Sequence, residues 1–395
     1  MSVSSVNRSM IRCRPKRKPV MLTSPALFAL GNIERGRVFA STSHQLVQPY
    51  FAKQVKLAHK ITRGEFNGKG VTETERGFII TDLKLWEKVH TLPRVLDRQM
   101  YGSRIGLAKA LKRLGYETWF VYVDSMGIGL PLVDESLLAE LRGFGVDRLI
   151  PVEIKNPREI DSLSWLRDMA VHIGDKIFVT GNAGRIDWVY PQALNLDGEV
   201  RISYLGTGGG YLFGEDFALM SSCGLSDGRP TMKHDFQGSI NRDFFDAGIR
   251  TGRIFHLPMQ IQDICPPELM KLIGLKRRIF SYTDHVDLEA VLDKGGSRIA
   301  FNEAYYRANS DRIDAILDRL KFDTVTLWPD VSSFLANPSD LPLGGLLFDR
   351  ASTSVAAAFV RDGWNVHLTE EKHGIMGGNG GARCSTTFLW VRDAG

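Results

Sequence analysis

Apolar residues recur along this chain in two alternating patterns, which predict helices and strands in turn. In residues 310–320, four apolar side chains share one helix face because their spacing follows the 3.6-residue helical period. They are Ile313, Ile316, Leu317 and Leu320. Residues 117–125 and 323–328 are short runs rich in β-branched and aromatic residues, which is typical of strands. Since segments of the two kinds follow one another over most of the chain, the sequence predicts an α/β protein.

The expected elements can be given as residue ranges. Helices are expected over 103–115, 135–143, 310–320 and 352–363. Strands are expected over 117–125, 148–154, 175–181, 199–205, 216–222, 323–328, 365–369 and 385–391. Residues 47–100 are mixed, and their pattern favours neither helix nor strand.

Length and composition favour one large folded unit. The chain has 395 residues, of which 43% are hydrophobic and 24% are charged, and these values are typical of a globular protein with a sizeable core. No segment rich in Pro, Gly and Ser divides the body of the chain. We therefore expect a basic, disordered N-terminal tail over residues 1–45 and a single domain over residues 46–395.

The net charge of +5 comes from the start of the chain. Residues 1–50 contain eight Lys and Arg residues and a single acid, Glu34, whereas the remainder has slightly more acids than bases. The body therefore lacks the basic excess of a nucleic-acid groove. The basic, Ser-rich start is typical either of a solvated tail or of a mitochondrial transit peptide.

Neither a membrane span nor a disulfide framework is expected. No stretch approaches the roughly 18–20 consecutive apolar residues that a span requires. Four cysteines (Cys13, Cys223, Cys265 and Cys384) lie far apart without a C-x-x-C pair, and the nine histidines show no metal-ligand spacing. A reducing compartment fits this cysteine usage best. We expect a cytoplasmic protein without a metal, with mitochondrial targeting as the alternative.

Two glycine motifs suggest chemistry that their context does not support. Residues 224–228 match the G-x-S-x-G pattern around Ser226, but Pro230 and polar sequence follow where a helix is required. A G-x-G-x-x-G pattern that starts at Gly206 fails at Tyr211, and a strand follows instead of a helix. We expect a loop at the first motif and a tight turn between strands at the second.

Cys384 follows the glycine-rich stretch 377–381, close to the start of an expected strand. Glycines permit unusual backbone conformations and allow the backbone to come close to a ligand. A thiol in this position is suited to the role of a nucleophile. The alternative is a structural cysteine in a glycine-rich loop.

Two further segments place charged residues beside apolar runs. Arg167 and Asp168 precede the apolar stretch that ends in the strand expected over 175–181. His285 and Asp287 are two residues apart in a segment of strand character, where side chains at i and i+2 point to the same side. These residues can therefore converge on one site. The alternative is that each is a satisfied polar residue at the end of a strand.

Taken together, these segments resemble the guanidine-modifying superfamily, the penteins, which includes arginine deiminases and amidinotransferases. The resemblance covers roughly residues 160–395 and lies in WLRDMAVHIGDKIFV, TGGGYLFGEDFALMSS, DHVDLEAVL and GGNGGARCST, in the family's order. It implies an α/β propeller of five pseudo-symmetric ββαβ modules within the domain at 46–395. The sequence departs from the family at Thr207, where an acid often begins the glycine-pair turn.

The resemblance also implies a role for each candidate residue. Cys384 is implied as the nucleophile and His285 as the general acid and base. Four residues are implied to bind the substrate: Asp168, Asp287, Arg167 and Gly209. The acids would hold the guanidinium, because carboxylates match its planar fork of N–H groups through charge-assisted hydrogen bonds.

The hypothesis that follows is covalent catalysis by Cys384. The thiolate attacks the guanidinium carbon, His285 protonates the departing nitrogen, and a thiouronium forms. Water would then complete a deiminase or hydrolase reaction on arginine or a related guanidino compound, whereas an amine would complete an amidinotransferase reaction. A non-catalytic pentein that binds a partner is the third reading.

The expected partner is a small guanidino molecule, and the reaction needs no cofactor. If the substrate is a free amino acid, a cation has to bind its carboxylate, and Arg242, Arg350 and Arg383 are candidates. A homo-oligomer is compatible with the sequence.

Overall fold

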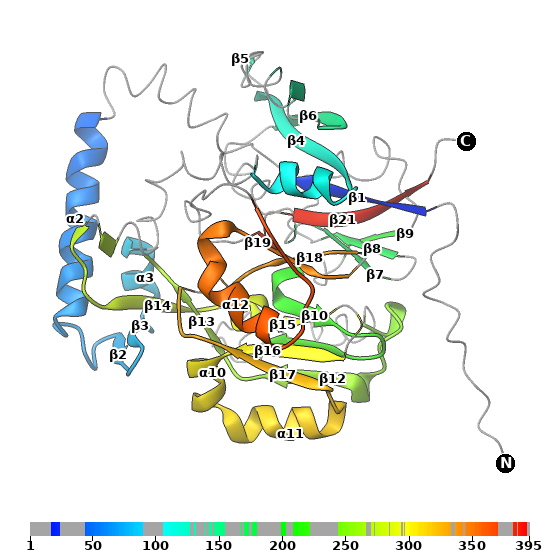
Figure 1. Cartoon of the computed structure of the whole chain (residues 1–395). Coiled ribbons are helices and arrows are strands. Elements are labelled where there is room, and N and C mark those ends of the chain that lie inside the picture. Colours follow the sequence, from blue (N-terminus) through cyan, green and yellow to red (C-terminus); the bar gives the residue numbers. More distant parts are fainter. Residues whose placement is uncertain are drawn as a thin grey trace.

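The computed structural model of the chain describes the following residues: 17–23, 44–89, 106–126, 130–131, 139, 142–143, 146–154, 167, 170–173, 176–179, 199–202, 208–221, 244–265, 270–271, 273–283, 285–293, 295, 297–332, 336–342, 344–369, 382–384 and 386–392. Strands and helices alternate through these ranges (Figure 1). The predicted α/β class is therefore confirmed.

Six small sheets contain the same three-stranded unit. In each unit, the middle strand pairs antiparallel with one neighbour and parallel with the other. In the order antiparallel partner, middle strand and parallel partner, the units are β7 (Ala170–Ile173), β8 (Lys176–Val179) and β9 (Glu199–Ile202); β10 (Tyr211–Phe213), β11 (Ala218–Ser221) and β12 (Ile254–Leu257); β13 (Gln260–Asp263), β14 (Arg278–Thr283) and β3 (Gly77–Ile80); β15 (Ala290–Leu292), β16 (Arg298–Asn302) and β17 (Thr324–Trp328); β18 (Ser339–Asp340), β19 (Leu346–Phe348) and β20 (Val366–Leu368); and β21 (Thr386–Arg392), β1 (Arg17–Thr23) and β4 (Glu117–Met126).

Three further strands extend two of these sheets. Strand β2 (Val71–Glu73) pairs with β3, and β5 (Leu130–Pro131) and β6 (Arg148–Ile154) pair with β4. No described sheet closes into a ring of hydrogen-bonded strands. The five-module arrangement is therefore not confirmed by strand pairing.

Helices make the crossovers that the parallel strand pairs require. Helices α10 (Glu303–Ala308) and α11 (Ser310–Leu320) connect β16 to β17, and α12 (Thr353–Arg361) connects β19 to β20. Asn302 caps α10 by accepting hydrogen bonds from the amides of Ala304 and Tyr305. Figure 1 shows α11 along the lower edge of the molecule, beside β12. Both α11 and α12 lie where the sequence predicts them.

Hydrophobic clusters fill the space between successive sheets and form the core. Four of these clusters each join a sheet to the next one along the chain, and they bypass the sheet of β13 and β14. The pairs Phe178 and Tyr211, Leu219 and Phe301, Ala300 and Phe348, and Leu347 and Phe388 each share a cluster across such a junction. Strand β21 in turn contacts β7, where Thr387 Oγ1 donates to the Ala170 carbonyl at 2.9 Å.

The sheet of β13, β14, β3 and β2 packs against two helices from the N-terminal part of the chain. These are α2 (His44–Thr62) and α3 (Leu83–Val89), which share a cluster with strands β3 and β14. Figure 1 shows α2 as the long blue helix at the left edge. The sequence pattern over residues 47–100 does not reveal this helix. Its Pro49, which disfavours a helix interior, weakens the helical signal.

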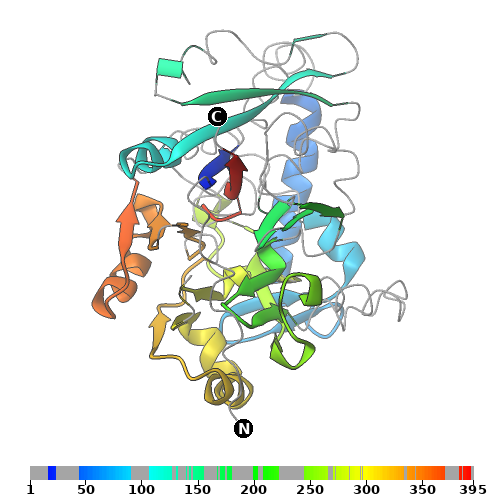
Figure 2. The same ribbon diagram turned by 90° about the vertical axis from the view of Figure 1, so that its right-hand side faces the viewer.

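Part of the expected N-terminal tail forms a strand. Residues 17–23 lie within the segment predicted to be disordered, yet they form β1 between β21 and β4. Figure 2 shows β1 in blue and β21 in red side by side. The run Val20 to Leu22 is apolar and suited to a strand, but the basic residues around it hide this signal. No helix in the described ranges has the length and apolarity that a membrane span requires.

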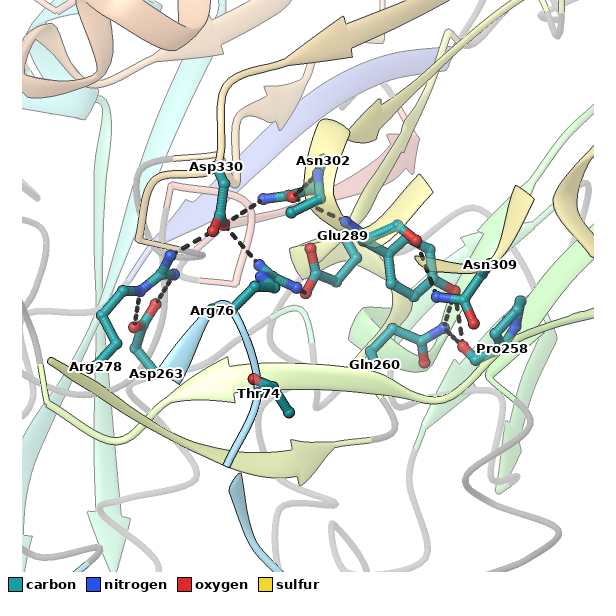
Figure 3. Close-up of polar contacts among 12 residues, drawn as sticks. Thr74, Arg76, Pro258, Gln260, Asp263, Arg278, Glu289, Asn302, Asn309 and Asp330 are labelled. Atoms are coloured by element: carbon teal, nitrogen blue, oxygen red, sulfur yellow. Dashed lines mark hydrogen bonds and ion pairs between the residues drawn. The ribbon is translucent and has the colours of Figure 1, made fainter. Parts of the chain in front are cut away.

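A polar network connects the β2–β3 turn to strand β14 and to the segment after His285 (Figure 3). The Arg278 guanidinium donates to both carboxylate oxygens of Asp263, at 2.8 and 2.9 Å, and to Asp330 Oδ1 at 2.9 Å. Arg76 donates to the same Asp330 oxygen at 2.8 Å and to Glu289 Oε1 at 2.9 Å. Two guanidinium groups therefore link three carboxylates that are far apart in sequence.

Glu289 should make the stability of the protein depend on pH. Burial raises the pKa of Glu289 to about 7 from 4.5, and the Arg76 guanidinium opposes only part of this effect. The folded protein then holds the Glu289 proton more tightly than the unfolded chain does. Its contribution to stability is full below pH 4.5 and is lost as the pH rises through 7.

We expect Glu289→Gln to remove this dependence. Relative to this variant, the wild type should lose about 3 kcal/mol of unfolding free energy between pH 4 and pH 8. Urea unfolding of both proteins across this pH range measures the difference. A difference that stays constant with pH would mean that Glu289 does not titrate in this way.

Candidate functional site

The site is formed by the segments that precede the first strands of five sheets. Because these strands start in the same region of the molecule, segments that are far apart in sequence meet there. The segments are Arg167 before β7, the turn η6 (Gly208–Gly210) before β10, the turn η8 (Val286–Leu288) before β15, Asn337 before β18, and the pair Arg383 and Cys384 before β21.

Backbone contacts connect these segments in a circuit. The amide of Arg167 donates to the Cys384 carbonyl at 3.2 Å, and the amide of Arg383 donates to the Asn337 carbonyl at 3.1 Å. The Asn337 side chain donates to the Asp287 carbonyl at 3.1 Å. Turn η8 contacts η6, and a Cβ on Gly208 in η6 would lie 2.6 Å from the Arg167 carbonyl. These contacts therefore hold the segments in place relative to one another.

Cys384 lies at the centre of this circuit and is almost completely buried, with 2% of its surface exposed. Its amide donates to Asn337 Oδ1 at 3.1 Å, and its Sγ lies 3.8 Å from Asp287 Oδ2, within the range of a weak S–H donor. The glycine-rich stretch 377–381 that precedes it lies outside the described residues.

His285 and Asp287 lie together, but not on a strand as the sequence suggests. Asp287 is in the 3-10 turn η8, and His285 is the extended residue that precedes the turn. The segment turns because β14 ends at Thr283, whose hydroxyl accepts a hydrogen bond from the His285 amide at 3.2 Å. His285 Nδ1 lies 3.8 Å from Asp287 Oδ1, and a quarter of the His285 side chain, 25%, is exposed.

Three of the predicted site residues come within reach of one another. One side-chain atom each from His285, Asp287 and Cys384 lie within 4.8 Å of one another. Within the described ranges, these three residues are also the group that could hold a metal ion, since imidazole, carboxylate and thiolate are all metal ligands. A cation bound there would lie beside the positive charge of Arg383.

Arg383 is bonded to carboxylates and is therefore not in a position to bind a substrate carboxylate. Its Nη1 donates to Asp287 Oδ2 at 2.7 Å and to the Gly208 carbonyl at 3.1 Å, and its Nε lies 3.4 Å from Asp340 Oδ1. Burial opposes its charge, but Asp287 and Asp340 outweigh burial and raise the pKa of Arg383. The expectation for Arg383 as a carboxylate-binding residue is thus not supported, because its partners here are acids.

Arg167 lies next to Arg383 and shares one of its acids. The Arg167 Nη2 donates to Asp340 Oδ1 at 2.6 Å. Burial lowers the pKa of Arg167, and the nearby Arg383 adds to this effect while Asp340 opposes it. The four side chains thus alternate in charge, in the order Arg167, Asp340, Arg383 and Asp287.

Other predicted residues are placed only in part. Gly209 is buried in turn η6, beside the Gly208 carbonyl that Arg383 binds. Arg350 lies in a 3-10 turn after β19. Asp168, Thr207, Ser226 and Arg242 lie outside the described residues.

Sequence reasoning missed Asn337 and Asp340. Both belong to the segment ANPSD, which precedes and enters β18 just as the other site segments precede their first strands. No motif marks this segment by itself.

No protein-family model matches the chain, and no curated protein has significant sequence similarity to it. Among solved structures, a mutant of DDAH from Pseudomonas aeruginosa complexed with citrulline has 9% identity and a TM-score of 0.34, and the match covers 64% of this chain and 87% of that one. SxtG, an amidinotransferase from Microseira wollei in a saxitoxin biosynthetic pathway, has 12% identity and a TM-score of 0.39, with 66% and 82% covered.

A third similar structure is the product-bound N-terminal domain of ArgZ, an arginine dihydrolase from the ornithine-ammonia cycle in cyanobacteria. It has 12% identity and a TM-score of 0.34, with 64% of this chain and 83% of that one covered. All three proteins belong to the guanidine-modifying superfamily that the sequence motifs resemble. At such low identities and TM-scores the likeness carries no argument, so the case for a function rests on the side chains described above.

Proposed function

We propose that this protein is a guanidine-modifying enzyme that hydrolyses arginine or a related guanidino compound, with Cys384 as the nucleophile. The observation that carries the proposal is the meeting of a thiol, an imidazole and a carboxylate. Atoms of Cys384, His285 and Asp287 lie within 4.8 Å of one another although they come from two distant parts of the chain.

Asp287 is the residue proposed to bind the substrate guanidinium. Its Oδ1 is buried and has no hydrogen-bond partner among the described residues, whereas its Oδ2 binds Arg383 and Asn337. A buried carboxylate oxygen without a donor favours binding of a cationic N–H group. The Arg383 contact supports the same chemistry, because Asp287 already binds a guanidinium of the chain itself.

The reaction can be written with the residues of the site. The Cys384 thiolate forms a C–S bond to the guanidinium carbon, and the C–N bond to the leaving nitrogen breaks as protonated His285 gives it a proton. His285 then takes a proton from a water molecule while the water oxygen attacks the thiouronium carbon. The C–S bond breaks to restore the thiolate. The hydroxyl proton of the tetrahedral adduct leaves as the carbonyl forms, so the net change converts guanidinium and water into a ureido product and ammonium. Proton transfer of this kind contributes roughly 10²–10⁴ in rate.

Arg167 and Arg383 support the nucleophile electrostatically. Both guanidinium groups interact favourably with a negative charge on Cys384. Cationic neighbours favour the thiolate, which is the reactive form of cysteine. The site can therefore hold an anionic sulfur in a buried position where its charge would otherwise be costly.

We also propose that the sheets that begin with β7, β10, β15, β18 and β21 are the five modules of a propeller. The hydrophobic clusters between successive sheets and the contact between β21 and β7 support a ring of these five. The sheet of β13, β14, β3 and β2 would then be an addition at its periphery. In such a ring, the starts of the first strands face a common centre, which accounts for the position of the site.

The exposure of His285 favours water as the acceptor. Its imidazole is the partly exposed member of the group formed with buried Cys384 and Asp287, so solvent can reach this side chain. Transfer of the amidino group to an amine uses the same residues and is the outcome against which hydrolysis is tested.

We expect the protein to release ammonia from arginine or agmatine without an added amine. The assay incubates each compound with and without glycine or ornithine and measures ammonia together with new guanidino products. Ammonia without acceptor supports hydrolysis. Guanidino products that form only with an amine would replace hydrolysis by transfer. The absence of both products with folded protein would contradict turnover of these two compounds.

A further inference from the structure

The side chain of Asn337 forms hydrogen bonds with two site residues. Its Nδ2 donates to Asp287 Oδ2 at 2.9 Å and to the Asp287 carbonyl at 3.1 Å. Its Oδ1 accepts the hydrogen bond of the Cys384 amide at 3.1 Å. The backbone carbonyl of Asn337 accepts from the Arg383 amide, also at 3.1 Å. Asn337 is thus a direct link between the segment of Asp287 and the segment of Cys384.

The two partners together require the chemistry of an amide side chain. Asp287 offers acceptor atoms and needs a donor, whereas the Cys384 amide is a donor and needs an acceptor. A carboxamide supplies both from one planar group, and a rotated amide would place its oxygen against the Asp287 carboxylate. An aspartate in this position could accept from Cys384 but could not, when ionised, donate to Asp287.

Burial strengthens the link. Asn337 has 2% of its surface exposed, and both Asp287 and Cys384 are buried. A buried polar group that loses its partner destabilises the fold, so the three residues favour one arrangement. Cys384 Sγ and Asp287 Oδ2 are held 3.8 Å apart in that arrangement.

We propose that Asn337 is a positioning residue that sets the separation between the Cys384 sulfur and the Asp287 carboxylate. This proposal rests on the proposed function, in which Asp287 binds a guanidinium that the sulfur attacks. With the amide in place, a guanidine bound at Asp287 lies against the sulfur. Without it, the Cys384 amide loses its side-chain link to the segment of Asp287, and Asp287 loses a donor that balances its charge.

The test measures the reactivity of the Cys384 thiol directly and does not depend on turnover. Iodoacetamide alkylation is followed across pH 5–10, and Cys384 is read by mass spectrometry in the tryptic peptide 384–392 that begins after Arg383. For Asn337→Asp we expect the midpoint of the alkylation profile to move up by about one pH unit. The rate at pH 7 should fall about tenfold, because a second carboxylate beside Asp287 disfavours the thiolate.

Asn302→Asp is the matched control. Asn302 is also fully buried and also donates to an aspartate, Asp330, at 3.3 Å, but it belongs to strand β16 and caps helix α10. This substitution likewise places a new carboxylate beside an existing one. We expect it to leave the Cys384 alkylation profile unchanged. If both variants shift the profile equally, the effect is not specific to Asn337 and the proposal is wrong.

A second variant and a second measurement cover the case in which Asn337→Asp does not fold. Asn337→Ala removes donor and acceptor without adding a charge and should slow the turnover of a guanidine about tenfold or more. In the wild type, the Cys384 amide should be protected from hydrogen exchange. Exchange of this amide at the rate of a free amide would overturn the proposal.

The outcomes separate the two proposals. A shifted alkylation profile together with no turnover of guanidines by the wild type leaves the role of Asn337 intact and contradicts the proposed function. Turnover by the wild type together with an unchanged profile and unchanged kcat in folded Asn337 variants contradicts the role of Asn337 alone.

Discussion

Cys384→Ala should lose the hydrolysis of guanidines completely, with a fall in kcat of about 10⁴-fold or more. The reason is that the covalent route needs the sulfur, and Cys384 is the cysteine that lies beside His285 and Asp287 in the described part of the chain. The same substitution should abolish the covalent adduct that mass spectrometry detects after acid quenching of the wild type with substrate. Turnover by Cys384→Ala at a substantial fraction of the wild-type rate would disprove the proposed mechanism.

Cys265→Ala is the matched control for this experiment. Cys265 is the other buried free cysteine among the described residues, and it packs in the cluster of α2, α3 and β14. Burial raises the pKa of Cys265 to about 12, with a further increase from Asp263. Its thiol is therefore protonated at neutral pH and unreactive. We expect Cys265→Ala to keep kcat within about twofold of the wild type.

Asp263→Asn should destabilise the protein by about 3 kcal/mol. Asp263 is buried and accepts two hydrogen bonds from Arg278, and these bonds, with Asp330, raise the pKa of Arg278 although burial opposes its charge. Removing the carboxylate charge leaves a largely buried guanidinium with Asp330 as its remaining ion-pair partner in the described network. Equilibrium unfolding in urea at pH 7 measures the loss of free energy.

Asp216→Asn is the control for the ion-pair argument. Asp216 also pairs with an arginine, Arg253, at 2.9 Å, but 68% of its side chain is exposed. Exposed pairs are screened by solvent, so this substitution should cost about 1 kcal/mol or less. If the two substitutions had equal effects, burial of the Arg278 pair would not be what stabilises the fold.

Helix α11 and strand β17 are predictable from the sequence because local patterns determine them, whereas helix α2 and strand β1 are not, because their local patterns are interrupted. Residues 310–320 carry a strong apolar face, and α11 occupies this range. Strand β17 lies within the run expected over 323–328. Short elements are different. Strands β10 and β15 have three residues each, which is too short for a period of two to be distinguished from a loop.

Only the site residues that lie in recognisable sequence motifs are predictable from the sequence. Cys384, His285 and Asp287 could be selected from sequence because glycine-rich and H-x-D patterns surround them. The pairing of Arg383 with Asp287 and Asp340 could not be predicted from sequence. Both acids come from segments more than forty residues away, and only the packing of the sheets brings them to Arg383. Asn337 has no local signal at all, since its importance lies in contacts across two sheets.

The position of β1 makes residues near the start of the chain part of the folded structure. This strand lies between β21, which directly follows the Cys384 segment, and β4. Removal of residues 1–23 would take away the middle strand of this sheet and leave β21 and β4 without their shared partner. N-terminal truncations that keep the fold should therefore end before Arg17.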